Sequence, residues 1–288
     1  MKGKIGLTAF AAILVLGIGY VAAADEAAVL AQMTSAEKLM GEQKTAQAEA
    51  ALKEAGAMIV KDAAGSGAFG ETEAGWVQTE VTGLHKGAAG YDIMGLRVKD
   101  LYGGIIPASK GDFAAAAAYA KKLADGSSGV AKAKLETAVK ALNDAAAGKG
   151  DKELAQRRLS VTLGATVFIG KALDLADKKQ FKEAARYVNA AGTYMRDEAK
   201  VFVEKNNIEI KRASTELLAC GDDLRRGEEA FDNSVLEGLI NDAEGAVMQA
   251  GAAAPAEAPK EVKKEEPKKA PAAKGEGAKG EKAPNAGK

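Results

Sequence analysis

The amino-acid sequence predicts an all-α protein, an antiparallel helical bundle or helical-hairpin array with a disordered C-terminal tail. Three observations indicate this class. Apolar residues recur at helical spacing through residues 25–250, helix-favouring alanine, leucine, lysine and glutamate are abundant, and five of the six prolines lie beyond residue 250. Only Pro107 interrupts the earlier chain. The sequence shows no alternating strand pattern bounded by turns, so we expect helices alone.

The first 24 residues have the pattern of a cleavable secretory signal peptide. Lys2 and Lys4 precede an uncharged apolar stretch, and Ala22-Ala23-Ala24 forms a small-residue cleavage site before Asp25. We therefore expect cleavage after Ala24 and a periplasmic or secreted protein with no stable membrane span. The alternative is a retained anchor helix, because the stretch is close to the ~20 residues that span a bilayer.

Each expected helix of the domain at 25–250 has one apolar face with members at i, i+3, i+4 and i+7. The members are Val77, Val81, Leu84, Ala88, Tyr91, Val98 and Leu101 between Trp76 and Tyr102; Leu135, Ala138, Val139, Leu142 and Ala146 over 128–147; Phe181, Ala184, Val188, Ala191, Met195, Ala199 and Phe202 over 181–206; and Ala213, Leu217, Cys220 and Leu224 near the end. The segment from Leu159 to Ala176 is apolar almost all round, which indicates a central buried helix.

Helix breaks are predicted at the glycine clusters in 65–75, 103–104, 126–128 and 148–151. Ser128 and Asp151 are candidate N-caps, and residues 34–37 have capping-box spacing. The pattern predicts seven or eight helices with short connections, which favours antiparallel neighbours.

The tail at 251–288 consists mainly of Ala, Pro, Lys, Glu and Gly, so it cannot bury enough apolar surface to fold. Nine lysines against six glutamates give the tail a charge of +3, whereas the domain at 25–250, with 29 basic and 34 acidic residues, carries −5. Neither part has the concentrated basic face of a nucleic-acid-binding protein, and we expect no nucleic-acid partner. The tail is either a solvated linker or a tether that contacts anionic envelope polymers.

Two segments resemble the turn and second helix of a tetratricopeptide repeat. One is Gly111-Asp112-Phe113-Ala114-Ala115-Ala116, followed by Ala120 and Leu123; the other is Lys179-Gln180-Phe181-Lys182-Glu183-Ala184, followed by Tyr187, Val188 and Ala191. Phe113 and Phe181 are 68 residues apart, twice the period of that family. The first-helix Trp/Leu-Gly/Tyr pattern is missing before both. The resemblance implies a helical scaffold that binds other proteins.

Several residues could carry chemistry, and each has a simpler structural interpretation. Residues 65–70 fit the pattern G-x-G-x-x-G, but a helical segment precedes them, which favours a loop between helices over a nucleotide site. Cys220 continues an apolar face and is expected in the core. His85 is the only histidine, and a metal site would need carboxylates or Cys220 beside it. Acidic pairs such as Asp222-Asp223 lack EF-hand spacing, which favours a solvated helix face.

The stretch from Trp76 to Tyr102 is also rich in glycine, with Gly83, Gly87 and Gly90 at i, i+4 and i+7. The glycines indicate either close packing against a neighbouring backbone or a soft helix that orders on a partner. Trp76, His85 and Tyr91 are the candidate contacts for such a partner.

No nucleophile, base and orienting group can be assembled from neighbouring motifs, so we expect neither catalytic residues nor a cofactor. The sequence predicts an exported helical protein that acts as a protein-interaction or cell-envelope scaffold module. The alternative is a helical bundle that binds a small ligand or a metal ion in the periplasm. The oligomeric state is left open.

Overall fold

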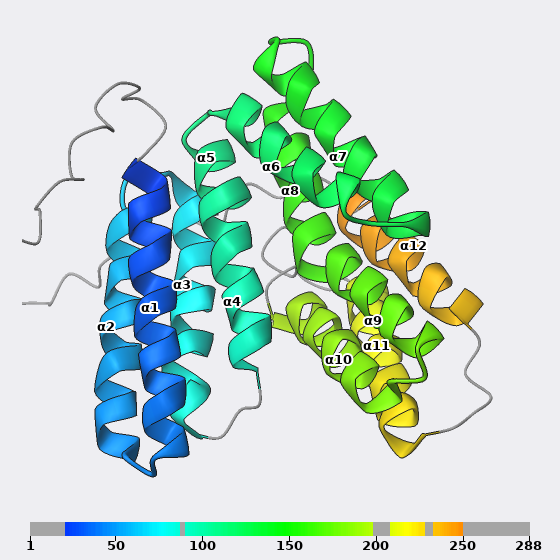
Figure 1. Ribbon diagram of the computed structural model, residues 1–288. Coiled ribbons are helices and arrows are strands. Elements are labelled where there is room, and N and C mark those ends of the chain that lie inside the picture. The colour runs from blue at the N-terminus through cyan, green and yellow to red at the C-terminus, as the bar shows by residue number, and fades with distance from the viewer. Residues whose placement is uncertain (1–20, 87–89, 198–207, 228–232, 250–288) are drawn as a thin grey trace, which may run out of the picture. The chain divides into compact units, whose positions relative to one another are not determined.

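The computed structural model describes residues 21–86, 90–197, 208–227 and 233–249. Within these ranges the chain is all-α (Figure 1). The helices are α1 (Val21–Gly41), α2 (Thr45–Ala63), α3 (Ala68–Gly83), α4 (Tyr91–Asp100), α5 (Ile106–Ser109), α6 (Phe113–Asp125), α7 (Gly129–Ala146), α8 (Lys152–Val161), α9 (Val167–Asp177), α10 (Phe181–Asp197), α11 (Ile208–Arg226) and α12 (Asn233–Gln249). A short 3₁₀ turn, η1 (Leu84–Lys86), extends α3.

Two π-helical turns join pairs of these segments into longer helices. η2 (Leu101–Ile105) links α4 to α5, and η3 (Thr162–Thr166) links α8 to α9. The twelve α segments therefore form ten helical runs in the described part of the chain, more than the seven or eight that the sequence predicts. The difference arises partly because the predicted helix from Trp76 to Tyr102 is divided between α3 and α4.

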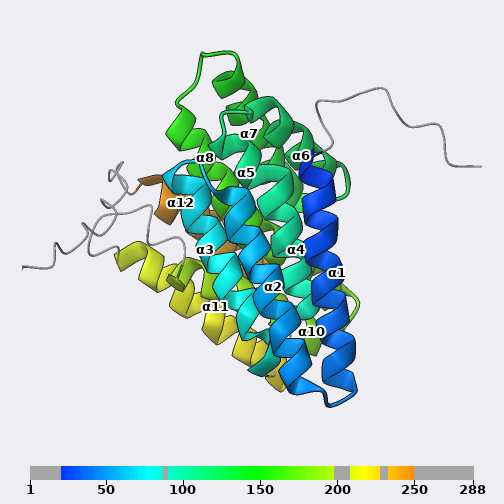
Figure 2. The ribbon, with the colours of Figure 1, turned by 90° about the vertical axis from the view of Figure 1, so that its left-hand side faces the viewer.

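Consecutive helices pack side by side as hairpins, which is what short connections favour. The pairs α1–α2, α2–α3, α6–α7, α9–α10 and α10–α11 are in contact, and α1 also contacts α4 (Figures 1 and 2). α12 packs on α7, α8, α9 and α11. The antiparallel bundle that the sequence predicts is thus confirmed for the described residues.

The apolar faces bury as the helical spacing predicts. On α2, Leu52, Ala55 and Ile59 are fully buried, and on α11 the predicted face of Ala213, Leu217, Cys220 and Leu224 lies in the core. One hydrophobic cluster is formed by residues from α1 through to Leu163 of η3. A second is formed by residues of α8 to α12 together with Ile93 of α4. On α7 the prediction is wrong at one position, because Ala145 is buried where Ala146 was expected.

The predicted central helix is confirmed inside the continuous run Lys152–Asp177. By length and composition alone this run could cross a membrane, but 67% of its most apolar window is buried inside the protein. Contacts with α7, α10 and α12 surround it. Packing in the bundle therefore accounts for its apolar character.

Three of the predicted helix boundaries are confirmed, and two are wrong. The break in 65–75 lies at its start, between the end of α2 at Ala63 and the start of α3 at Ala68, and α3 then runs through Gly70 and Gly75. Residues 34–37 lie inside α1 instead of starting a helix. At 103–104 the helix continues as a π-helical turn. The breaks at 126–128 and 148–151 are confirmed, with Ser128 at the N-cap of α7 and Asp151 at that of α8. Asp151 accepts a hydrogen bond from the backbone N–H of Leu154.

Other predictions fall partly or wholly outside the described residues. The described chain begins at Val21, near the end of the predicted signal peptide, and the predicted tail at 251–288 is not described. The helices above all belong to one unit of the chain, within residues 1–256. Phe113 and Phe181 begin α6 and α10 after tight inter-helix turns, while the repeat resemblance itself stays a prediction.

Candidate functional site: a buried polar cluster beside a cationic pocket

The two π-helical turns each place a glycine under a tyrosine ring from another helix. A Cβ atom on Gly103 of η2 would overlap the ring of Tyr119 on α6, and one on Gly164 of η3 would overlap the ring of Tyr194 on α10. Glycine is therefore required sterically at both positions. π-Helical turns of this kind occur frequently at functional sites. Both tyrosine hydroxyls reach polar groups that are buried beside the turns.

Tyr119 donates a hydrogen bond to Asp100, the residue before η2. Its hydroxyl lies 2.7 Å from Asp100 Oδ1. Asp100 is buried, and burial raises the pKa of its carboxyl to about 7, although the hydrogen bond from Tyr119 and the charges of Arg97 and Lys99 lower it. The carboxyl group therefore gains or loses its proton near neutral pH.

A second buried carboxyl group lies on α3. Ser160, the penultimate residue of α8, lies 2.5 Å from Glu73 Oε1 and donates its hydroxyl hydrogen to it. The same Ser160 Oγ lies 2.5 Å from the hydroxyl of Tyr194, which therefore donates to Ser160. Burial raises the pKa of Glu73 to about 7, against the opposing effects of Ser160 and Arg97. Glu73 and Asp100 thus share the same titration range.

Arg97 of α4 supplies the positive charge of this cluster. It is 6% exposed, and its guanidinium carbon lies 5.1 Å from the ring centres of both Phe168 and Tyr194. Such cation–π contacts stabilise a desolvated guanidinium, which stays protonated at any physiological pH. Arg97, Glu73, Asp100, Ser160 and Tyr194 line one cavity of about 20 Å³, comparable to a single water.

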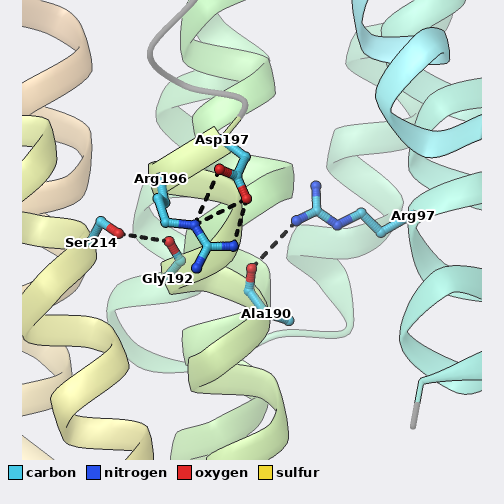
Figure 3. A network of polar contacts seen from close by, with 6 residues as sticks. All are labelled: Arg97, Ala190, Gly192, Arg196, Asp197 and Ser214. Atoms are coloured by element: carbon cyan, nitrogen blue, oxygen red, sulfur yellow. Dashed lines mark hydrogen bonds and ion pairs between the residues drawn. The ribbon is translucent and has the colours of Figure 1, made fainter. Parts of the chain in front are cut away.

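Arg97 also connects the cluster to α10. Its Nη2 donates to the carbonyl oxygen of Ala190 at 3.4 Å, while Ser214 of α11 donates to the carbonyl of Gly192 at 3.0 Å (Figure 3). Figure 3 shows these two side chains reaching α10 from opposite sides. The backbone of α10 is therefore held between α4 and α11.

On its other side, Arg97 lines a larger pocket of about 750 Å³. The walls of this pocket come from α3, η1, α4, α10 and α11. Apolar side chains and backbone form part of the lining, together with the polar side chains of Thr79, Asn189 and Thr193. A volume of this size is typical of sites for small ligands. We refer to it as the cationic pocket, for the charges described next.

The charged residues of the cationic pocket are mostly basic. Among the residues that the structure describes, four cations, Lys86, Arg97, Arg186 and Arg225, line it with a single carboxylate, Glu80. Two of the cations have acidic partners outside the lining. Arg186 pairs with two carboxylates, since Nη2 lies 2.5 Å from Asp92 Oδ1 and Nη1 lies 2.7 Å from Glu183 Oε2. Arg225 Nη2 lies 3.2 Å from Asp222 Oδ1. The pair of Arg225 with Asp222 is exposed and therefore weak in water, so an anion can compete for the guanidinium group of Arg225.

The three residues predicted as partner contacts are half-buried and belong to three different elements, α3, η1 and α4. Trp76 is half-buried in the middle of α3. His85 is half-buried in η1, where Nδ1 lies 2.6 Å from the carbonyl oxygen of Thr82. Tyr91 begins α4 and packs against the first hydrophobic cluster, where burial and the nearby Glu37 of α1 raise its pKa. Their role as contacts stays a prediction.

The structure does not place the three glycines of this stretch on one helix. α3 ends at Gly83, α4 begins after Gly90, and Gly87 lies outside the described residues. Ordering on a partner stays a prediction. A Cβ atom on Gly83 or Gly90 would meet nothing within 4 Å, so neither glycine is needed for close packing. Three glycines within eight residues each cost a helix up to ~1 kcal/mol relative to alanine, which favours a break there.

The remaining sequence candidates have structural roles. Residues 65–70 form the α2–α3 connection and the first turn of α3, where Ser109 Oγ accepts a hydrogen bond from the backbone N–H of Gly70 at 2.7 Å. Cys220 is buried in the second hydrophobic cluster. Asp222 and Asp223 pair with Arg225 and Arg226. Among the residues that the structure describes, no group of three or more His, Cys, Asp and Glu side chains is arranged to hold a metal ion.

Sequence reasoning missed the polar cluster, although a signal for it existed. Glu73 lies four residues before Val77 on the apolar face of α3, and Arg97 lies four residues before Leu101. Charged residues in register with a buried face indicate a polar group that has a partner inside the protein. Comparison of the chain with protein-family models, curated proteins and solved structures gives no match.

Proposed function

We propose that this chain is an exported helical-bundle protein that binds a small anionic ligand in the cationic pocket between α3–η1–α4 and α10–α11. The observation that carries the proposal is the lining of that pocket, in which the described residues provide four cations and one carboxylate. Carboxylate, sulfate and phosphate groups are the ligands that such a set of guanidinium and ammonium groups recognises. The apolar part of the lining accommodates the remainder of an organic anion.

The pocket supports the small-ligand alternative for this protein more directly than a scaffold role. A scaffold needs an exposed apolar anchor or patch. Among the described residues, the exposed large hydrophobic side chains are Val60, Ile208 and Val235, which lie on α2, α11 and α12. The protein-interaction role, and the helical scaffold that the repeat resemblance implies, remain proposals with Trp76 as their first test. Wild-type levels of partner recovery by a folded Trp76→Ala protein would count against them.

Two neighbouring arginines of α11 provide a matched test of the anion site. Arg225 and Arg226 each pair with an aspartate three residues earlier, but only Arg225 lines the pocket. Sulfate is a suitable probe because it keeps its charge throughout the neutral range. Its binding is measured by titration calorimetry on the full chain, on Arg225→Gln and on Arg226→Gln.

We expect Arg225→Gln to weaken sulfate binding roughly 5- to 20-fold, the loss of one charge-assisted hydrogen bond. Arg226→Gln should bind sulfate like the wild type. Equal effects of the two substitutions would show that sulfate responds only to the general charge of α11. That result, or no sulfate binding by the wild type, would overturn the proposal.

A further inference from the structure

Arg97 belongs to two environments at once. It lines the cationic pocket, and it also lines the small cavity that contains the carboxyl groups of Glu73 and Asp100. The side chain is nearly fully buried and held between two aromatic rings. The charge of Arg97 therefore acts both on the two carboxyl groups and on any anion in the cationic pocket. Electrostatic interactions are strong in the buried interior, where the dielectric constant is low.

The charge of the cluster depends on how many protons the two carboxyl groups hold. When both carboxyl groups are ionised, their two negative charges exceed the positive charge of Arg97, and the cluster carries −1. With one protonated the cluster is neutral, and with both protonated it carries the full +1 of Arg97. An anion in the pocket is attracted most strongly in the last state and repelled in the first.

We infer that binding of an anion in the cationic pocket is coupled to proton uptake by Glu73 and Asp100, with Arg97 as the shared group. The inference rests on the proposed anion site. Coupling between two sites is reciprocal, so an anion that favours the protonated carboxyl groups must bind more tightly at lower pH. The protein would then release its ligand as the pH rises.

The groups that face the two carboxyl groups are few. Arg97 and Lys99 come from α4, Tyr119 from α6 and Tyr194 from α10, while Ser160 of α8 contributes only a hydroxyl. Both tyrosines are hydrogen-bonded within the cluster, and burial and Asp100 raise the pKa of Tyr119 further above its usual range. Among these groups, Glu73 and Asp100 are therefore the ones that titrate near neutral pH.

Glu73 and Asp100 titrate in the pH range that this coupling requires. Burial raises the pKa of both carboxyl groups to about 7, so each exchanges its proton over the range in which the pocket is to be tested. His85 serves as the control for this assignment, because it adjoins the pocket residue Lys86.

The experiment is titration of the full-length chain with sulfate from one unit below to one unit above pH 7. It is repeated in two cationic buffers of different ionisation enthalpy, which gives the number of protons taken up per sulfate bound. We expect net uptake near neutral pH, and about a tenfold weaker affinity at the upper pH, within the usual range of coupling between sites.

Variants assign the protons. The double variant Glu73→Gln, Asp100→Asn should bind sulfate with little dependence on pH and no net uptake, while His85→Gln should keep both. If the double variant does not fold, the proton count of the wild type and of His85→Gln still decides the question. Loss of the uptake in His85→Gln would overturn the inference by assigning the proton to the histidine.

The anion site and the proton coupling fail in different ways. Sulfate binding of equal affinity across this range without proton uptake would overturn the coupling and leave the anion site in place. No sulfate binding at any pH, with the fold intact, would overturn the anion site and the coupling together.

Discussion

The ring of Tyr119 occupies the space that any side chain at Gly103 would need. This contact fixes the ring while its hydroxyl donates to Asp100 at 2.7 Å. Tyr194 has the same relation to Gly164, and its hydroxyl reaches Ser160 and, through it, Glu73. Each π-helical turn therefore packs against one tyrosine ring, and the hydroxyl of that tyrosine is hydrogen-bonded to a buried carboxyl group, directly for Asp100 and through Ser160 for Glu73.

The first prediction concerns the packing of the Tyr119 ring against Gly103. Gly103→Ala should destabilise the protein by about 1–3 kcal/mol, because the added methyl group forces the Tyr119 ring or the helix to move. The free energy of unfolding is measured by urea denaturation. Gly75→Ala is the matched control, since Gly75 is also helical and a methyl group added there would meet nothing within 4 Å. The control should be stabilising by up to ~1 kcal/mol, and equal effects of the two substitutions would contradict the packing described.

The second prediction concerns pH. The pKa values of Glu73 and Asp100 are about 7 in the folded protein, against 4.5 and 3.8 as ordinary values. The folded state therefore holds protons that the unfolded chain releases. The stability that these protons contribute is complete below about pH 4 and is lost as the pH rises through 7, on the order of 3 to 4 kcal/mol for each carboxyl group.

The measurement compares the wild type with the double variant Glu73→Gln, Asp100→Asn over this pH range. The free energy of unfolding of the variant, relative to the wild type, should increase with pH, because the amides carry no proton to lose. A constant difference between the two proteins from acid to neutral pH would show that neither carboxyl group has a raised pKa.

The third prediction concerns the single thiol. Burial, with a smaller effect of Asp223, raises the pKa of Cys220 to about 12. The thiolate is the reactive form of cysteine. The folded protein should therefore react with a thiol reagent near pH 8 only as fast as local or global unfolding exposes Cys220. The urea-unfolded chain should react at an ordinary rate. Rapid labelling of the folded protein would contradict the position of Cys220 in the core.

The fourth prediction concerns the attachment of α12. Glu244 is buried, and its carboxylate pairs with Lys134 of α7 and lies 3.5 Å from Arg158 Nε of α8. Glu244→Gln should cost about 1–3 kcal/mol, because two largely buried cations lose their partner. Hydrogen exchange should accelerate in α12 first. Glu237→Gln, an exposed position on the same helix, is the control and should leave exchange in α12 unchanged.

Helical periodicity predicts those features of the fold that depend on one helix at a time. The buried face of α11 follows from the spacing of Ala213, Leu217, Cys220 and Leu224, and the start of α8 follows from Asp151 after a glycine pair. Local sequence determines these features, because the burial of one face and the capping of one helix end need no knowledge of the partner.

The π-helical turns could not be predicted in this way. Gly103 and Gly104 read as a helix break, since glycine is unfavourable in a helix interior. The helix continues there because Tyr119 packs on it, and that ring comes from a different helix. The same reason applies to the cationic pocket, whose cations come from α4, α10, α11 and η1. Their assembly depends on how helices pack together.

Both the proposed function and the proton coupling require an anion in the cationic pocket. The most direct measurement is the crystal structure of the full chain with selenate, whose position anomalous scattering identifies. We expect a selenate peak in contact with Arg97, Arg186 or Arg225. A pocket without selenate, in crystals where selenate binds other surface cations, would contradict the central claim.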